Sequence, residues 1–323
     1  MSRKFQLLKY LVADIVSALG SWSAFYAYRK LSLDGSQTSA DLLAGLTGQF
    51  YTGLFLVPFF WLFLYYISGY YSDVFRKSRL SELWITFGNT FIGTLFLFLI
   101  FHFDGAKYAY HANVYTLYIY FFIFHFSLTY LPRLIITTNT THRVHRGEIG
   151  FNTLMIGSNE KAVDVFVEMQ NQIRGNGNKF IGFVNVHDHT RNMLRNYLPH
   201  LGSLENVRSI ITDKKVEEVI IAIETSENDM VNRIINKLID ADVIIKAIPS
   251  MYDILTGRVR MNSILGTPLI SVSHNLMPAW QENVKSFLDY SISSLALLLS
   301  LPVIIFLVIG IKLTSRGPVF YSH

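Results

Sequence analysis

The hydrophobic pattern of the chain changes character twice. Four long apolar stretches fill its first part, at roughly 11–27, 50–67, 83–101 and 114–136, and each approaches the ~20 residues that a helix needs to cross a bilayer. Short apolar runs then alternate with amphipathic segments, before a last long apolar stretch. The pattern predicts a four-helix transmembrane bundle over 1–137, an α/β domain over 150–250, a linker over 251–284 and a membrane segment over 285–323.

The middle segment indicates a parallel sheet. Apolar strand-like runs occupy 152–156, 180–186, 219–223 and 243–248, and amphipathic stretches such as 204–213 and 228–240 separate them. Strands that alternate with helices in this way are typical of a doubly wound, Rossmann-like α/β fold.

The first strand-to-helix turn of such a sheet is a candidate ligand site, because backbone N–H groups and a helix N-terminus face an anion there. Here the turn is Gly157-Ser158-Asn159. Only the first glycine of the G-x-G-x-x-G fingerprint is present, and Glu160 adds negative charge where a phosphate would lie. The three residues are therefore a weak candidate for ligand binding, with a purely structural or assembly role as the alternative.

Charge bears on partners and orientation. The formal net charge is +5, with 16% charged and 51% hydrophobic residues, and the basic excess lies beside the apolar stretches. This distribution follows the positive-inside rule and predicts no nucleic-acid partner. The basic amino terminus, second loop and segment after the fourth stretch place both chain ends in the cytoplasm. Asp14 lies inside the first stretch, where we expect it to reach the basic interface or pair with Lys4 or Lys9.

Few residues offer metal or nucleophile chemistry. The chain has no cysteine, which excludes disulfides, thiolate metal sites and a cysteine nucleophile. His187, Asp188 and His189 fall in a run typical of a solvated loop, so no metal site is predicted.

The last apolar stretch contains Pro302 near its middle, and proline removes a helix hydrogen bond and clashes with the preceding turn. A nearby hydroxyl, such as that of Ser300, can bond a freed backbone group. Lys312 and Arg316 follow the stretch, so a full crossing would carry positive charge outside. We therefore expect a re-entrant membrane helix, kinked or broken at Ser300 and Pro302, that returns to the cytoplasmic face.

At this point the chain resembles the polyprenyl glycosylphosphotransferase family, the long-form monotopic phosphoglycosyl transferases of bacterial surface-polysaccharide assembly. The order of bundle, Rossmann-like domain and membrane stretch is similar, as are the runs Gly182-Phe-Val-Asn-Val and Leu201-Gly-Ser-Leu-Glu. The most specific part is the start of the catalytic unit, with Lys285, Asp289, Pro302, Lys312, Ser315, Gly317 and Pro318.

The resemblance implies an activity and its partners. The family transfers a sugar 1-phosphate from a nucleoside-diphosphate sugar to undecaprenyl phosphate, during synthesis of exopolysaccharide, capsule or O-antigen. It implies a multi-pass protein of the bacterial inner membrane that contacts membrane lipid and polyprenyl phosphate, and it leaves a homodimer open. In the family, a downstream Asp-Glu pair supplies the nucleophile with Mg²⁺; no cofactor is expected in this chain.

The chain departs from the family at its end. It stops at His323, and its 323 residues contain no Asp-Glu dipeptide. The adjacent pair Glu217-Glu218 is expected to form a solvated turn before a strand. No catalytic residue is therefore predicted, and we expect the chain to be inactive alone, as a truncated enzyme or a fragment. The alternative is a non-catalytic membrane scaffold or nucleotide-sensing subunit.

Overall fold

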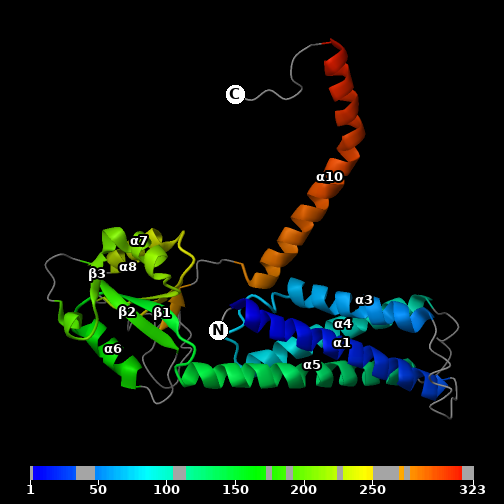
Figure 1. Cartoon of the computed structure of the whole chain (residues 1–323), viewed down its shortest axis with the longest axis horizontal. Helices are drawn as coiled ribbons and strands as arrows, with labels where there is room; N and C mark the ends of the chain where they lie inside the picture. The colour runs from blue at the N-terminus through cyan, green and yellow to red at the C-terminus, as the bar shows by residue number, and fades with distance from the viewer. Residues whose placement is uncertain are drawn as a thin grey trace. The chain divides into compact units, whose positions relative to one another are not determined.

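The computed structural model places most of the chain in two compact units (Figure 1). One comprises Met1–Lys9, Phe75–Glu82 and Pro132–Leu276, and the other comprises Tyr10–Val74, Leu83–Leu131 and Met277–His323. The structure describes residues 3–33, 48–104, 114–171, 177–186, 192–223, 228–249, 269–272 and 277–314. Ser315, Gly317, Pro318, the segment 187–189 and most of the predicted linker lie outside these residues.

Long helices form the part of the chain predicted as a membrane bundle. They are α1 (Arg3–Leu33), α3 (Gly48–Ile67), α4 (Arg79–Asp104) and α5 (Val114–His145). Among the described residues, four helices are long and apolar enough to cross a membrane: α3, α4, α5 and the later helix α10 (Ala279–Thr314). The prediction of a membrane protein is confirmed at this level. A first span at α1 remains a prediction, because α1 is a helix but not one of these four.

Polar residues on the inward side of α1 explain its lower hydropathy. Asp14, Ser17 and Ser21 are all buried. The Tyr71 hydroxyl donates a hydrogen bond of 2.7 Å to Asp14 Oδ2. A phenol from elsewhere in the bundle thus bonds the buried carboxylate, and the expectation that Asp14 reaches the basic interface or pairs with Lys4 or Lys9 stays a prediction.

A polar cluster, the His125 cluster, lies at the centre of the same unit. Its imidazole is fully buried, with Ser21 Oγ 2.8 Å from Nδ1 and the Tyr65 hydroxyl 2.9 Å from Nε2. Trp61 stacks on the ring with centroids 3.6 Å apart. A Cβ at Gly93 would lie 2.4 Å from the Trp61 ring, so glycine there makes room for the indole. Residues of α1, α3, α4 and α5 thus meet at one point.

The other unit contains a sheet of six strands among the described residues, in the order β3-β2-β1-β4-β5-β6. All neighbouring strands are parallel except β5 and β6, which are antiparallel. The strands are β1 (Phe151–Ile156), β2 (Asn178–Asn185), β3 (His200–Ser203), β4 (Glu218–Ile221), β5 (Ile244–Ala247) and β6 (Ile270–Val272). The connecting segments contain α6 (Glu160–Asn171), η1 (Met193–Asn196), η2 (Leu204–Asn206), α7 (Val207–Lys214) and α8 (Asn228–Leu238).

Helices cover both faces of the sheet, as Figure 1 shows, with α6 on one side and α7 and α8 on the other. Residues such as Phe166 of α6 pack with Met155 and Phe183 on one face. Ile210 of α7 and Ile234 of α8 pack on the opposite face. The predicted Rossmann-like architecture is confirmed, and two separate apolar cores hold it together.

Two strands were not predicted. β3 contains His200, Gly202 and Ser203, which interrupt any apolar pattern. β6 lies within the predicted linker and pairs antiparallel to β5, so the sheet is mixed rather than wholly parallel. Both are short edge strands, whose pairing depends on a neighbouring strand more than on their own sequence.

The carboxyl-terminal helix α10 runs through 36 residues without interruption, with Pro302 inside it. The predicted break is therefore wrong as a gap in the helix: losing one hydrogen bond can bend a helix without ending it. Figure 1 shows that the axis of α10 changes direction along its length. Ser300 Oγ donates to the Leu297 carbonyl at 2.9 Å, whereas the carbonyl that Pro302 leaves without its helical partner is that of Leu298, four residues before it. The helix begins at Ala279, which places its first residues inside the predicted linker.

The amino-terminal end of α10 packs on α3 within the same unit. The Asn283 side chain donates to the Tyr66 carbonyl at 2.6 Å, and the Phe63 and Phe287 rings lie 5.2 Å apart. None of the residues of α10 is buried. Most of this apolar helix is therefore available to lipid, which is the surroundings its composition requires.

Candidate functional site

The predicted ligand turn forms at the carboxyl end of β1. Gly157 has φ +122°, and a Cβ there would lie 2.2 Å from the Ala222 carbonyl oxygen just beyond β4. Its N–H donates to the Val184 carbonyl at 3.0 Å. The conformation and close packing both require glycine. Close approach to a neighbouring strand is thus enough to explain the residue.

The rest of the turn also uses its polar groups within the protein. The carbonyl of buried Ser158 accepts the Met193 N–H at 3.0 Å, which joins η1 to the turn. Asn159 Oδ1 accepts the Ala162 N–H at 3.1 Å and so caps the start of α6. The structure therefore brings Gly157, Ser158 and Asn159 together at the expected edge, and ligand binding there stays a prediction.

Asn185, at the carboxyl end of β2, was missed by sequence reasoning. It is 6% exposed, and its Oδ1 has no hydrogen-bond partner. A buried acceptor without a partner is uncommon and marks a place where a water or ligand donor would be stabilised. An asparagine at the end of an apolar run is the signal that could have identified it.

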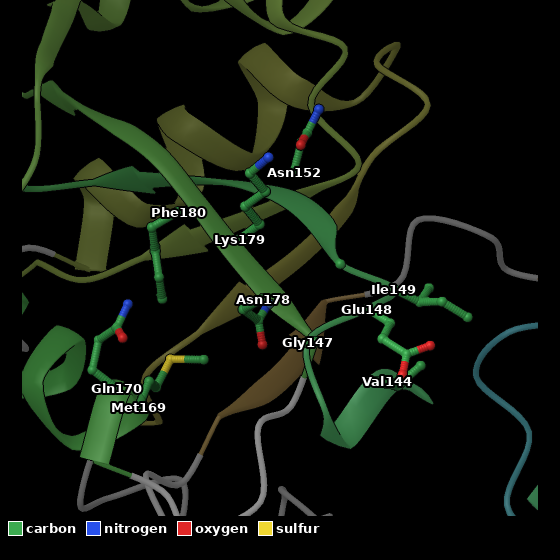
Figure 2. Close-up of a pocket in the computed structure, with 12 residues that line it drawn as sticks. Val144, Gly147, Glu148, Ile149, Asn152, Met169, Gln170, Asn178, Lys179 and Phe180 are labelled. Carbon is green, nitrogen blue, oxygen red and sulfur yellow. The ribbon is translucent and has the colours of Figure 1, made fainter. Parts of the chain in front are cut away.

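A recess lies at the amino-terminal ends of the strands, opposite the Gly157 turn. Its volume is about 650 Å³, within the range of small-molecule pockets. Figure 2 shows Asn178 and Phe180 of β2 facing the end of α6, at Met169 and Gln170. The other lining residues belong to the end of α5 and the start of β1 and β2: Val144, Gly147, Glu148, Ile149, Gly150, Asn152, Gly177 and Lys179.

Asn178 has the most constrained polar group of this recess. Its amide nitrogen donates to Glu218 Oε1 at 2.7 Å and to Thr153 Oγ1 at 3.0 Å. These two bonds fix the amide orientation and leave Oδ1 buried without a partner. The wall of the recess therefore contains an unused acceptor just beneath its surface.

Beside Asn178, Glu218 is at the centre of an ionic network. Its carboxylate lies 3.3 Å from an Arg76 guanidinium nitrogen and also pairs with the Lys246 ammonium. The Arg76 guanidinium lies over the Phe151 ring, 4.1 Å from its centroid. Glu217 is exposed, but Glu218 is 1% exposed, so the expectation of a solvated turn is wrong for the second residue. Partners distant in sequence compensate the buried charge.

The family-motif residues of α10 fall at its two ends. Lys285 and Asp289 are exposed and one helical turn apart, so they share a face. Lys312 is exposed near the carboxyl end, about 40 Å further along a straight helix at 1.5 Å per residue. The structure does not bring the two ends together. Among the described residues, no group of three or more His, Asp or Glu side chains is placed so that it could hold a metal ion.

The exposed apolar helices and the two-faced sheet define a membrane protein with a Rossmann-like domain. A family model described as a CoA-binding domain matches residues 66–249, which is more than half of the chain. The chain belongs to this CoA-binding domain family.

Two curated proteins agree with the resemblance to the polyprenyl glycosylphosphotransferases and confirm it at the level of family. Both are called UDP-glucose:undecaprenyl-phosphate glucose-1-phosphate transferase. The one from Xanthomonas campestris pv. campestris is 24% identical over 131 residues, which cover 40% of this chain and 27% of the relative. The one from Escherichia coli (strain K12) is 24% identical over 121 residues, covering 36% and 26%. The match therefore spans about a quarter of each relative.

Among solved structures, the chain is similar to UDP-D-quinovosamine 4-dehydrogenase from Vibrio fischeri. The identity is 16%, and the match covers 38% of this chain and 94% of that one with a TM-score of 0.29. A TM-score this low assigns no fold. The Rossmann-like architecture rests on the strand order of this chain's own sheet.

Proposed function

We propose that this chain is the membrane and α/β part of a phosphoglycosyl transferase. The reaction moves a sugar 1-phosphate from a nucleoside-diphosphate sugar to undecaprenyl phosphate at the bacterial inner membrane. A lipid phosphate oxygen forms a bond to the sugar-bearing phosphorus, the diphosphate bridge breaks, and a nucleoside monophosphate leaves. The similarity to two glucose-1-phosphate transferases is the observation that carries the proposal.

The exposed surface of α10 supports this assignment. A lipid-linked acceptor has to be met at the membrane interface, and α10 offers an apolar surface that is not covered by the rest of its unit. Lys285 near its start and Lys312 near its end would lie near anionic headgroups, each worth about 1 kcal/mol close to the surface. In this proposal, both ends of α10 lie on the cytoplasmic side.

The 323 residues alone are expected to show no transfer, because they contain no Asp-Glu dipeptide. Membrane vesicles carrying this chain would be given UDP-glucose, undecaprenyl phosphate and Mg²⁺, and UMP release would be measured. The E. coli relative is the positive control. A chimera in which this chain replaces the aligned segment of that relative tests the positive half of the proposal. It is expected to keep UMP release, whereas a membrane-inserted but inactive chimera would count against the proposal, as would UMP release by this chain alone.

The path of α10 is testable by cysteine labelling, since the natural chain has no cysteine. Glu282→Cys and Thr314→Cys mark the two ends of the helix, and Ser39→Cys marks the segment of the chain between α1 and α3. With a membrane-impermeant maleimide on intact spheroplasts, only the Ser39 variant is expected to react. All three are expected to react after permeabilisation. Labelling of the Thr314 variant in intact spheroplasts would show that α10 crosses the membrane.

A further inference from the structure

A segment that leads into α4 is attached to the amino-terminal end of β4 by a buried ion pair. Arg76 belongs to the segment Phe75–Glu82, and Glu218 opens β4; both lie in the same compact unit. The Glu218 side chain is 2% exposed and the Arg76 side chain 22%. By contrast, the partners in the Arg208–Asp240 pair are 54% and 71% exposed. The first pair is therefore the one whose charges are held away from water.

The carboxylate of Glu218 is the group to which this segment binds. Arg76 and Lys246 bring two positive charges to it, and Asn178 adds an amide N–H at 2.7 Å. The Phe151 ring lies under the guanidinium at 4.1 Å, which adds a cation–π contact. A bare carboxylate buried among these strands would be strongly unfavourable, so its cations are required there.

The same segment is held at its other end. Glu82 is fully buried, lies 4.0 Å from the Lys77 ammonium, and accepts a hydrogen bond of 3.2 Å from Thr137 Oγ1. The Lys77 side chain is itself only 8% exposed. The contacts of Arg76 and Glu82 thus hold the backbone on either side of Lys77 and limit access of a protease to it.

We propose that Arg76 and Glu218 form a latch that docks the segment Phe75–Glu82 on the amino-terminal edge of the sheet. Asn178 connects the latch to the recess of Figure 2, because it lines the recess and its nitrogen holds Glu218. A change in the position of Asn178 therefore acts on a residue that holds the latch closed. The family model covers 66–249 and includes both partners of the latch. This inference does not depend on the proposed transferase activity.

Trypsin tests the latch, because Arg76, Lys77 and Arg79 are cleavage positions inside the docked segment. The full chain in detergent would be digested briefly, and cleavage after Lys77 followed by mass spectrometry. Glu218→Gln keeps the shape of the side chain but leaves Arg76 and Lys246 facing each other without a carboxylate. We expect cleavage after Lys77 to become about tenfold faster, because proteolysis follows the population of the open segment.

The matched control is Glu217→Gln, which makes the same change at the exposed neighbour and is expected to leave cleavage unchanged. Arg76→Gln releases the latch from the segment side and is expected to match Glu218→Gln without disturbing the strands. The double variant is expected to be no faster than Glu218→Gln, because either single change already removes the Arg76–Glu218 contact. Hydrogen exchange of the β1 and β4 amides shows that the sheet stays folded. Equal cleavage in the wild-type chain and both single variants would overturn the latch.

Discussion

Replacing Gly157 with alanine is expected to unfold the α/β domain or bring it close to unfolding. The residue has φ +122°, and the new Cβ would lie 2.2 Å from the Ala222 carbonyl oxygen. Strained backbone and overpacking each cost about 1–3 kcal/mol, so the sum is on the order of 2–6 kcal/mol. A domain is usually stable by only about 5–15 kcal/mol, so this loss is a large fraction of the total.

The measurement has to report on the sheet itself. All four tryptophans, at 22, 61, 84 and 280, lie outside the domain, so their fluorescence does not follow its unfolding. Hydrogen exchange of the β1 and β4 amides in increasing urea does follow it. Gly150→Ala is the control, because its Cβ would meet neighbouring atoms only at 3.4 Å and beyond. A Gly157→Ala variant with the wild-type urea midpoint would show that the turn relaxes without cost, contrary to this account.

The sequence predicts the central strands well because their signal is local. β1, β2, β4 and β5 are apolar runs between turn residues, and each was predicted within a few residues. β3 carries no such signal, since His200, Gly202 and Ser203 are not typical strand residues, and β6 is only three residues long. Their pairing comes from the free edges of β2 and β5, which only the assembled sheet supplies.

The candidate sites divide in the same way. The turn at Gly157 was located correctly because it follows the first buried strand, a purely sequential rule. The burial of Glu218 could not be predicted, because Arg76 and Lys246 approach it from distant parts of the chain. A glutamate beside another glutamate at a strand start looks solvated until those partners are in place. The orphaned oxygens of Asn178 and Asn185 likewise appear only when neighbours use up the other polar groups.

In the helix α10, the effect of proline on the helix is smaller than the sequence predicted. Proline disfavours a helix interior, so a break at Pro302 was predicted, yet the helix continues on both sides. The residues around Pro302 are strong helix formers such as leucine and isoleucine, and Ser300 bonds a backbone carbonyl one turn back. The sum of these preferences outweighs one missing hydrogen bond, and the bend relieves the clash.

The His125 cluster was also missed, since scattered histidines carry no ligand spacing. Its geometry leads to the second large effect: His125→Leu is expected to destabilise the helical bundle. The Ser21 hydroxyl lies 2.8 Å from Nδ1, and the Tyr65 and Thr129 hydroxyls lie 2.9 Å and 3.3 Å from Nε2, so both ring nitrogens have polar partners. Leucine would remove the hydrogen bonds at both ring nitrogens and leave the buried Tyr65 hydroxyl without its imidazole partner. Each of the two bonds between membrane helices is worth about 0.6–1.7 kcal/mol, and the buried Tyr65 hydroxyl that loses its imidazole partner adds about 1–3, so we expect a loss of about 2–6 kcal/mol.

Thermal unfolding in detergent, followed by tryptophan fluorescence, measures this loss directly, because Trp61 stacks on the His125 ring. His142→Leu makes the same substitution at an exposed position of α5 and is expected to leave the transition unchanged. His125→Gln keeps a donor and an acceptor and is expected to recover part of the lost stability. Tyr65→Phe removes a single bond and is expected to lower the transition by a smaller step. If His125→Leu and His142→Leu unfold at the same temperature, the cluster does not hold the four helices together, and its burial needs another explanation.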